Sequence, residues 1–356
     1  MTRLLRTLLG SVGLAALAGC VSPVAMHRAV LEYDRTVSRV ETELLLLNIA
    51  RARHHHPIHF TAISGIAATF DFRVTGGLGG GVGETDALAL SLEGTAGESP
   101  TVSIVPVQGE EFTRRLLTPL DEAKFEFLLH QGVEPAILVR PMARGLLVES
   151  EGGPVTLRND PGQPESYTGF RRRVLQLSAL SAAQQLHVAP IGAEPGARIA
   201  ICNFDPGRAT HAERERLAAR ARALPRNAVL VDLHASGPGG DLPLRGQLLL
   251  RNFKEILAFL GRSIVEQPEF AVGPDPRTGP VPRNPVHALE IRETRERPPD
   301  AGFAAQERSL WYSIGPGEDA LASSWNHEAF DVLYQLYQLT VTDVAASPMP
   351  MITISK

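Results

Sequence analysis

The spacing of apolar residues changes at Pro57, and this change constrains the fold more than any other feature of the sequence. From Ala29 to Arg53, apolar residues recur alternately three and four positions apart, which predicts one amphipathic helix. From Ile58 to Val74 they recur at every second position except Ser64, which predicts one long strand with an apolar face, or two strands broken near Ser64 and Gly65. Because both patterns recur farther along the chain, we expect an α+β fold with an N-terminal amphipathic helix.

The apolar stripe of this first helix allows two uses. Its three-and-four spacing is also the spacing of a coiled coil, which would join subunits. Three heptads are few for an independent coiled coil, and Leu45 and Leu46 widen the stripe beyond a narrow seam. We therefore expect Val40, Leu44 and Leu47 to lie in the protein's own core, with self-association as the alternative.

Glycine-rich connections follow the first alternating run. The segment "TGGLGGGVGETD" leads to a second alternating run around Leu88–Leu92, and "TVSIVPV" forms a third run after Pro100. Three such runs predict an antiparallel β meander, so residues 29–120 are expected to form a helix plus β-meander region. The clustered glycines also suggest a phosphate-binding loop, but the G-x-G-x-x-G spacing fails at every register.

The remainder of the chain mixes helical and strand patterns. We expect a mixed α/β region over 121–266, a Pro/Gly-rich loop over 267–285 and a C-terminal strand-helix-strand region over 286–356. Helices are predicted for "DEAKFEFLLHQG", "FRRRVLQLSALSAAQQL", "THAERERLAARARAL", "LRGQLLLRNFKEILAFLGRS" and residues 326–339. Strands are predicted twice in "PAILVRPMARGLLVES" and once each in "ARIAICNF", "NAVLVDLHA", "HALEIRE", "SLWYSIG" and "MITIS".

The N-terminus has the three-part layout of a secretory signal. Arg3 and Arg6 precede an uncharged stretch that ends in small residues before Cys20. The stretch Leu17 to Cys20, "LAGC", resembles the lipobox of bacterial lipoproteins. The resemblance implies that residues 1–19 are a signal peptide, that Cys20 is the lipidation site and that residues 20–28 are a lipidated tether. Several acyl chains would then attach the protein stably to a membrane through Cys20.

The residue after the cysteine bears on the destination. In such lipoproteins an Asp at this position commonly retains the protein at the inner membrane, and here the position holds Val21. The resemblance therefore implies a lipid anchor on the periplasmic face of the cell outer membrane. The mature part looks like an uncharacterised family of bacterial envelope lipoproteins, a likeness that implies no activity.

Composition excludes some classes of function. Removing Arg3 and Arg6 from the 35 basic residues leaves 33 against 39 acidic ones, a formal charge of −6 for the mature chain. A nucleic-acid-binding protein normally has a basic face, so no nucleic-acid partner is expected. Cys202 is the only thiol left once Cys20 is acylated, so no internal disulfide is possible, and we expect Cys202 to be buried.

One histidine cluster suggests a metal. His54, His56 and His59 in "HHHPIH" could supply three imidazole ligands of the kind that zinc prefers. No Asp or Glu lies nearby to complete the usual pattern, and histidines are also favoured at the end of a helix by its dipole. They are weak metal candidates, and no metal or other cofactor is expected.

No catalytic motif is present in the sequence. The G-x-S-x-G and S-x-x-K patterns of nucleophilic serines do not occur. Asp232, His234 and Ser236 alternate along a predicted strand, which places them about 7 Å apart, too far for a hydrogen-bonded triad. "LVDLHASGPGGDLPLRG" lacks the Lys of a phosphate-binding loop. We therefore expect a protein that is not an enzyme.

The function expected from these features is a non-catalytic binding or envelope-assembly role, through a protein partner or self-association. The alternative is a subunit of an oligomeric outer-membrane secretion pore, similar to the curli exporter, in which residues 66–92 contribute a β-hairpin. A hydrolase of envelope polymers is the third possibility.

Overall fold

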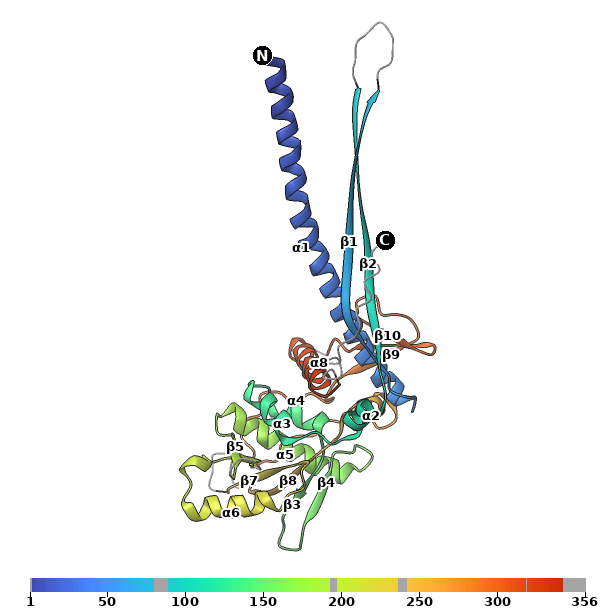
Figure 1. Cartoon of the computed structure of the whole chain (residues 1–356). Coiled ribbons are helices and arrows are strands. Elements are labelled where there is room, and N and C mark those ends of the chain that lie inside the picture. The colour runs from blue at the N-terminus through green and yellow to red at the C-terminus, as the bar shows by residue number, and fades with distance from the viewer. Residues whose placement is uncertain (1, 80–88, 193–196, 236–241, 318, 342–356) are drawn as a thin grey trace. The chain divides into compact units, whose positions relative to one another are not determined.

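The computed structural model describes residues 2–79, 89–192, 197–235, 242–317 and 319–341 (Figure 1). The chain divides into two compact units, one of residues 1–41 with 61–106 and one of residues 42–60 with 107–356. The expected regions 121–266, 267–285 and 286–356 all fall inside the second unit. Helices combine with mixed and antiparallel sheets, so the prediction of an α+β fold is confirmed.

The first unit contains most of one long helix and one long pair of strands. Helix α1 runs over Thr2–Arg53, and strands β1 (Phe60–Gly79) and β2 (Ala89–Val107) pair in a two-stranded sheet. The connection between the strands is too short to return along a strand of this length, so the pair is antiparallel. No helix among the described residues is long and apolar enough to cross a membrane.

The expected three-stranded meander is wrong in its strand count. Within the described residues, positions 89–92 of the second run and the whole of "TVSIVPV" belong to the single strand β2. Both strands of a two-stranded sheet are edge strands, where an unpaired backbone position tolerates Gly and Pro. For that reason Gly94, Gly97 and Pro100 do not end the strand, although the sequence pattern suggested that they would.

The second unit is built on a six-stranded sheet with strand order β4-β3-β8-β7-β6-β5. Its strands are β3 (Ala143–Val148), β4 (Val155–Arg158), β5 (His187–Ile191), β6 (Arg198–Cys202), β7 (Ala228–Leu233) and β8 (Leu244–Leu250). Only β6 and β7 are parallel, because helix α6 (His211–Arg222) provides the crossover between them. The strands predicted in "ARIAICNF" and "NAVLVDLHA" and the helix predicted between them are therefore confirmed.

Helices cover the two faces of this sheet (Figure 1). On one face, Leu217 and Ala221 of α6 pack against Ala200, Cys202 and Leu230 of β6 and β7. On the other face, α5 (Pro164–Ala182) lays its apolar residues against β3 and β8. Helix α6 contacts β5 and β6, and the side chain of Arg245 on β8 is exposed.

Two stretches of the mixed region differ from expectation. The segment "PAILVRPM" forms helix α4 (Pro135–Met142) where a strand was predicted, and all of its residues are buried. An element buried on every side has no polar face, so its sequence has no period that separates helix from strand. The segment "LRGQLLL" forms β8 where the start of a helix was predicted, and helix α7 (Phe253–Val265) begins only after the N-cap Asn252.

Of three further helices in the second unit, only the one within "DEAKFEFLLHQG" was predicted from the sequence. Helix α2 spans Glu110–Leu117, α3 spans Glu122–His130 and a short 3-10 helix spans Pro206–Arg208. Helix α3 is closed by Gly132 at φ 81°, as predicted. The Pro/Gly-rich segment over 267–285 contains no helix or strand.

The C-terminal region forms a second small sheet. Strands β9 (Ile291–Thr294), β10 (Ala305–Glu307) and β11 (Leu310–Ile314) pair antiparallel in the order β10-β11-β9, and helix α8 (Ala320–Val341) follows. The predicted helix over 326–339 lies inside α8. The predicted terminal strand "MITIS" lies outside the described residues.

The C-terminal turns of α1 belong to the core of the second unit, but not through the predicted residues. Leu45, Leu46 and Ile49 are fully buried, whereas the expected core residues Val40, Leu44 and Leu47 are only half-buried. The buried residues instead follow a second stripe, which the sequence pattern had shown only as a widening of the first.

Helix α7 lies against this end of α1 at Gly261. A Cβ atom on Gly261 would lie 2.7 Å from the backbone nitrogen of Arg53 and 2.9 Å from the carbonyl oxygen of Ile49. Such distances are too short for any side chain, so the two backbones can approach this closely only at a glycine.

Candidate functional site

A cavity of about 500 Å³ lies at the β4 side of the six-stranded sheet, between strands β3, β4 and β8 and helix α7. Four arginines line it: Arg144, Arg158, Arg251 and Arg262. We call this cavity the arginine pocket. Its volume is in the range of small-molecule binding sites.

The strands place a glycine in the wall of the pocket. Gly145 of β3 is the direct partner of Arg158 on β4 and of Leu249 on β8. The register of β3 against β8 shifts between Ala143 and Gly145, so Arg144 occupies a β-bulge. Bulges redirect side chains, which explains how the consecutive residues Arg144 and Gly145 both line the same cavity.

Three of the four arginines, Arg144, Arg158 and Arg262, have no acidic partner within the described residues. Arg144 and Arg158 are exposed and Arg262 is half-buried. No carboxylate among the described residues forms an ion pair with any of the three. Guanidinium groups are planar donors whose geometry matches the oxygens of carboxylates and phosphates.

Arg251 forms the base of the pocket and is only 5% exposed. Its guanidinium donates hydrogen bonds to the carbonyl oxygens of Arg140, Pro141 and Asn159, at 2.8 to 3.1 Å, and stacks 4.1 Å from the ring of Phe259. Burial lowers the pKa of Arg251 to about 9, and it stays charged at neutral pH. A buried cation whose hydrogen-bond acceptors are all neutral favours an anion nearby.

Two carboxylates also line the pocket, but each is engaged by local hydrogen bonds. Glu255 accepts from the backbone N–H of Asn252 in the capping box of α7. Asp160 accepts from the N–H of Gly162 and from the side-chain amide of Gln163. With four guanidinium groups and two carboxylates, the pocket has a formal charge of +2.

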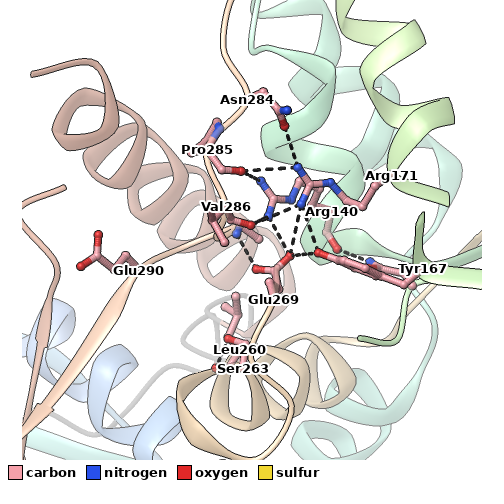
Figure 2. A network of polar contacts seen from close by, with 12 residues as sticks. Arg140, Tyr167, Arg171, Leu260, Ser263, Glu269, Asn284, Pro285, Val286 and Glu290 are labelled. Atoms are coloured by element: carbon pink, nitrogen blue, oxygen red, sulfur yellow. Dashed lines mark hydrogen bonds and ion pairs between the residues drawn. The ribbon is translucent and has the colours of Figure 1, made fainter. Parts of the chain in front are cut away.

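A buried polar network surrounds Glu269 (Figure 2). Glu269, from the Pro/Gly-rich loop, accepts hydrogen bonds from Arg140 at 2.7 Å, from the Tyr167 hydroxyl at 2.7 Å and from the Ala288 N–H at 2.6 Å. Arg171 donates to the same tyrosine hydroxyl at 3.1 Å. Two buried arginines, Arg140 and Arg171, thus share the single buried carboxylate of Glu269 as their counter-charge.

Arg140 connects this network to the pocket. Its guanidinium also donates to the carbonyl oxygens of Pro285 and Val286, so it holds the loop in place. Its own carbonyl oxygen accepts from Arg251 and from the Asn159 side chain. The base of the pocket is therefore attached to the rigid interior of the unit.

The candidate metal ligands are not gathered at one point. His54 Nε2 lies 2.8 Å from the Tyr312 hydroxyl, and His56 Nδ1 lies 2.6 Å from Glu307. The exposed His59 contributes its backbone, which pairs with the Asn48 side chain. Within the described chain, no three His, Cys, Asp or Glu side chains are grouped to hold a metal ion.

The alternating residues Asp232 and His234 lie close together, but Asp232 is held in an ion pair with an arginine. Asp232 forms an ion pair with Arg220 at 2.6 Å, and its other oxygen lies 3.8 Å from His234. The third member of the series, Ser236, lies outside the described residues. Cys202 is buried, as expected, and burial raises the pKa of its thiol to about 12, so it is not a reactive thiolate.

The candidate lipidation site, Cys20, lies within α1, and its side chain is outside the described part of the structure. Comparison with protein-family models, curated proteins and solved structures finds no match. The geometry of the arginine pocket is therefore the main evidence on function. Sequence reasoning missed this pocket because its arginines come from three strands or strand ends and one helix, and no short motif contains them.

Proposed function

We propose that this chain is a lipoprotein anchored to the periplasmic face of the outer membrane, with a non-catalytic role in binding an anionic ligand. The anchor is supported by the lipobox-like Leu17 to Cys20. The binding role is supported by one observation: four arginines line a single cavity, and three of them have no carboxylate partner among the described residues.

The chemistry of the lining favours binding over catalysis. Arginine stays protonated and cannot exchange protons with a substrate, so it is poorly suited to general acid–base chemistry. The carboxylates of Asp160 and Glu255 are already engaged by local hydrogen bonds. A set of guanidinium groups without carboxylate partners suits recognition of an anion by charge-assisted hydrogen bonds.

The binding role is tested by titrating the detergent-extracted full chain with inorganic phosphate in a calorimeter. Arg158→Gln should weaken binding by about tenfold or more, because a hydrogen bond to a charged group contributes about 1.5 to 3 kcal/mol. Arg216→Gln is the matched control, since Arg216 is exposed on α6, away from the pocket. Absence of binding, or equal loss in both variants, would refute the proposal.

The anchor is tested by labelling cells with a palmitate analogue. The parent chain should take up label and the Cys20→Ser variant should not. Label that persists in the variant would show that the lipid is not carried by Cys20.

A second candidate function is a subunit of an oligomeric secretion pore. It is favoured by the sheet of the first unit, which in the described residues consists only of β1 and β2, 20 and 19 residues long. An isolated pair of strands is marginally stable in water, and its unpaired edges invite strands from further copies of the chain. The native mass of the detergent-extracted protein separates the two functions, since a ring has several times the mass of a monomer.

A further inference from the structure

We propose that the ligand of the arginine pocket is a phosphorylated sugar, bound through a phosphate dianion. This inference rests on the proposed binding function and names the chemical class of its ligand. It follows from the charge of the pocket, from the type of its cations and from the other groups that line it.

The charge of the pocket matches a dianion. Four guanidinium groups and two carboxylates leave a formal charge of +2 around one cavity. A single carboxylate ligand would neutralise half of this charge, whereas a phosphate monoester carries nearly two negative charges at neutral pH. Three arginines without carboxylate partners among the described residues are also available as donors to phosphate oxygens.

The remaining lining indicates hydroxyl groups on the ligand. Asp160 and Glu255 bring carboxylate oxygens into a site that otherwise selects anions, and Thr156 adds a hydroxyl. Carboxylates would repel a bare anion but can accept hydrogen bonds from sugar hydroxyls, in addition to those they already accept. The cavity, at about 500 Å³, is also larger than inorganic phosphate needs.

The experiment compares ligands on the detergent-extracted full chain by calorimetry. The probes are glucose 1-phosphate, inorganic phosphate, gluconate and glucose. We expect glucose 1-phosphate to bind at least about tenfold more tightly than gluconate and more tightly than inorganic phosphate. Glucose alone should not bind measurably.

The dependence on pH identifies the dianion. The second pKa of a phosphate monoester is about 6, so lowering the pH from about 8 to about 5 should weaken glucose 1-phosphate binding by about tenfold. The arginines stay charged over this range. Binding of gluconate, whose carboxylate keeps its charge, should change far less.

The Asp160→Asn variant separates attraction of the anion from recognition of the sugar. Removing one negative charge should strengthen the binding of inorganic phosphate. The same change should reduce the advantage of glucose 1-phosphate over inorganic phosphate, because Asp160 no longer accepts as strongly from a hydroxyl. Arg216→Gln again serves as the control and should leave both affinities unchanged.

A competition experiment distinguishes a soluble sugar phosphate from a lipid headgroup. Lipid A dissolved in dodecyl maltoside is added to protein loaded with glucose 1-phosphate, and the maltoside alone is the control. Displacement by lipid A and not by the detergent indicates that the phosphosugar can be carried by a lipid. Failure to displace it limits the ligand to soluble phosphosugars, which still supports the proposed class.

The inference and the proposed function fail in different ways. If none of the anions binds, or if Arg158→Gln binds like the parent, the pocket is not an anion site and both are wrong. If the anions bind at the pocket but gluconate equals glucose 1-phosphate, or if binding does not weaken at low pH, only the phosphosugar is excluded.

Discussion

Arg140 and Glu269 form an ion pair of 2.7 Å in which the two side chains are only 1% and 0% exposed. A second guanidinium, that of Arg171, lies 4.0 Å from the same carboxylate. The pair joins helix α4 to the Pro/Gly-rich loop, two segments far apart in the sequence. One carboxylate thus holds a loop without regular structure against the core.

Substituting Glu269 should be strongly destabilising. Glu269→Gln keeps the shape of the side chain but leaves Arg140 and Arg171 buried without a counter-charge, which costs about 3 to 5 kcal/mol. Urea unfolding followed by circular dichroism measures the change. Glu296→Gln, at an exposed position, is the control and should change stability by less than about 0.5 kcal/mol.

The same ion pair makes stability depend on pH. Burial would raise the pKa of Glu269, but Arg140, Arg171 and the Ala288 N–H outweigh burial and hold its pKa below the ordinary value. The stabilisation is therefore complete above the unfolded-state pKa of about 4.3 and is lost as the pH falls through the lower folded-state value. The parent and Glu269→Gln should converge in stability in acid. A difference that stays constant from neutral pH into acid would contradict this assignment.

The two stripes of α1 should differ in their response to truncation. Leu46→Ala removes a fully buried side chain and should cost about 2 to 5 kcal/mol. Leu44→Ala, at a half-buried position two residues earlier, should cost clearly less. Both losses should be independent of protein concentration. If the unfolding midpoint of the parent rises with concentration and Leu44→Ala abolishes that rise, the helix joins subunits.

Chelators should leave folding unchanged. His54 Nε2 contacts the Tyr312 hydroxyl and His56 Nδ1 contacts Glu307, so these two ring nitrogens are engaged within the protein. Thermal unfolding with and without EDTA should give the same midpoint. A fall of many degrees would reveal a structural metal, since such metals contribute directly to folding.

A chemical signal at the helix N-terminus accompanies the correct prediction of α6, but it did not place the start of α7, where Asn252 and Glu255 form the same kind of capping box. Helix α6 is preceded by Thr210 and has Glu213 at its third position, and both groups form the reciprocal hydrogen bonds of a capping box. The long polar helix between two apolar runs was placed correctly. The buried helix α4 was predicted wrongly as a strand. All of its residues are buried, so its sequence has no apolar period that distinguishes a helix from a strand.

Strand β8 shows a second reason for error. Its residues Leu244 and Leu248 lie four positions apart, a spacing that fits a helix face as well as a strand face. Pairing with β3 and β7 on both sides selects the strand, and these partners are remote in sequence. The arginine pocket was missed for the same reason, since strand pairing brings Arg158 beside Gly145.

At Gly261 the backbone of helix α7 lies directly against the backbone of the last turn of α1. Residue 261 has no side chain that would separate α7 from the last turn of α1, so a displacement of that turn would directly displace the backbone of α7. The next residue along α7, Arg262, lines the arginine pocket. A side chain at position 261 would therefore push α7 away from the last turn of α1 and move the wall of the pocket at the next residue.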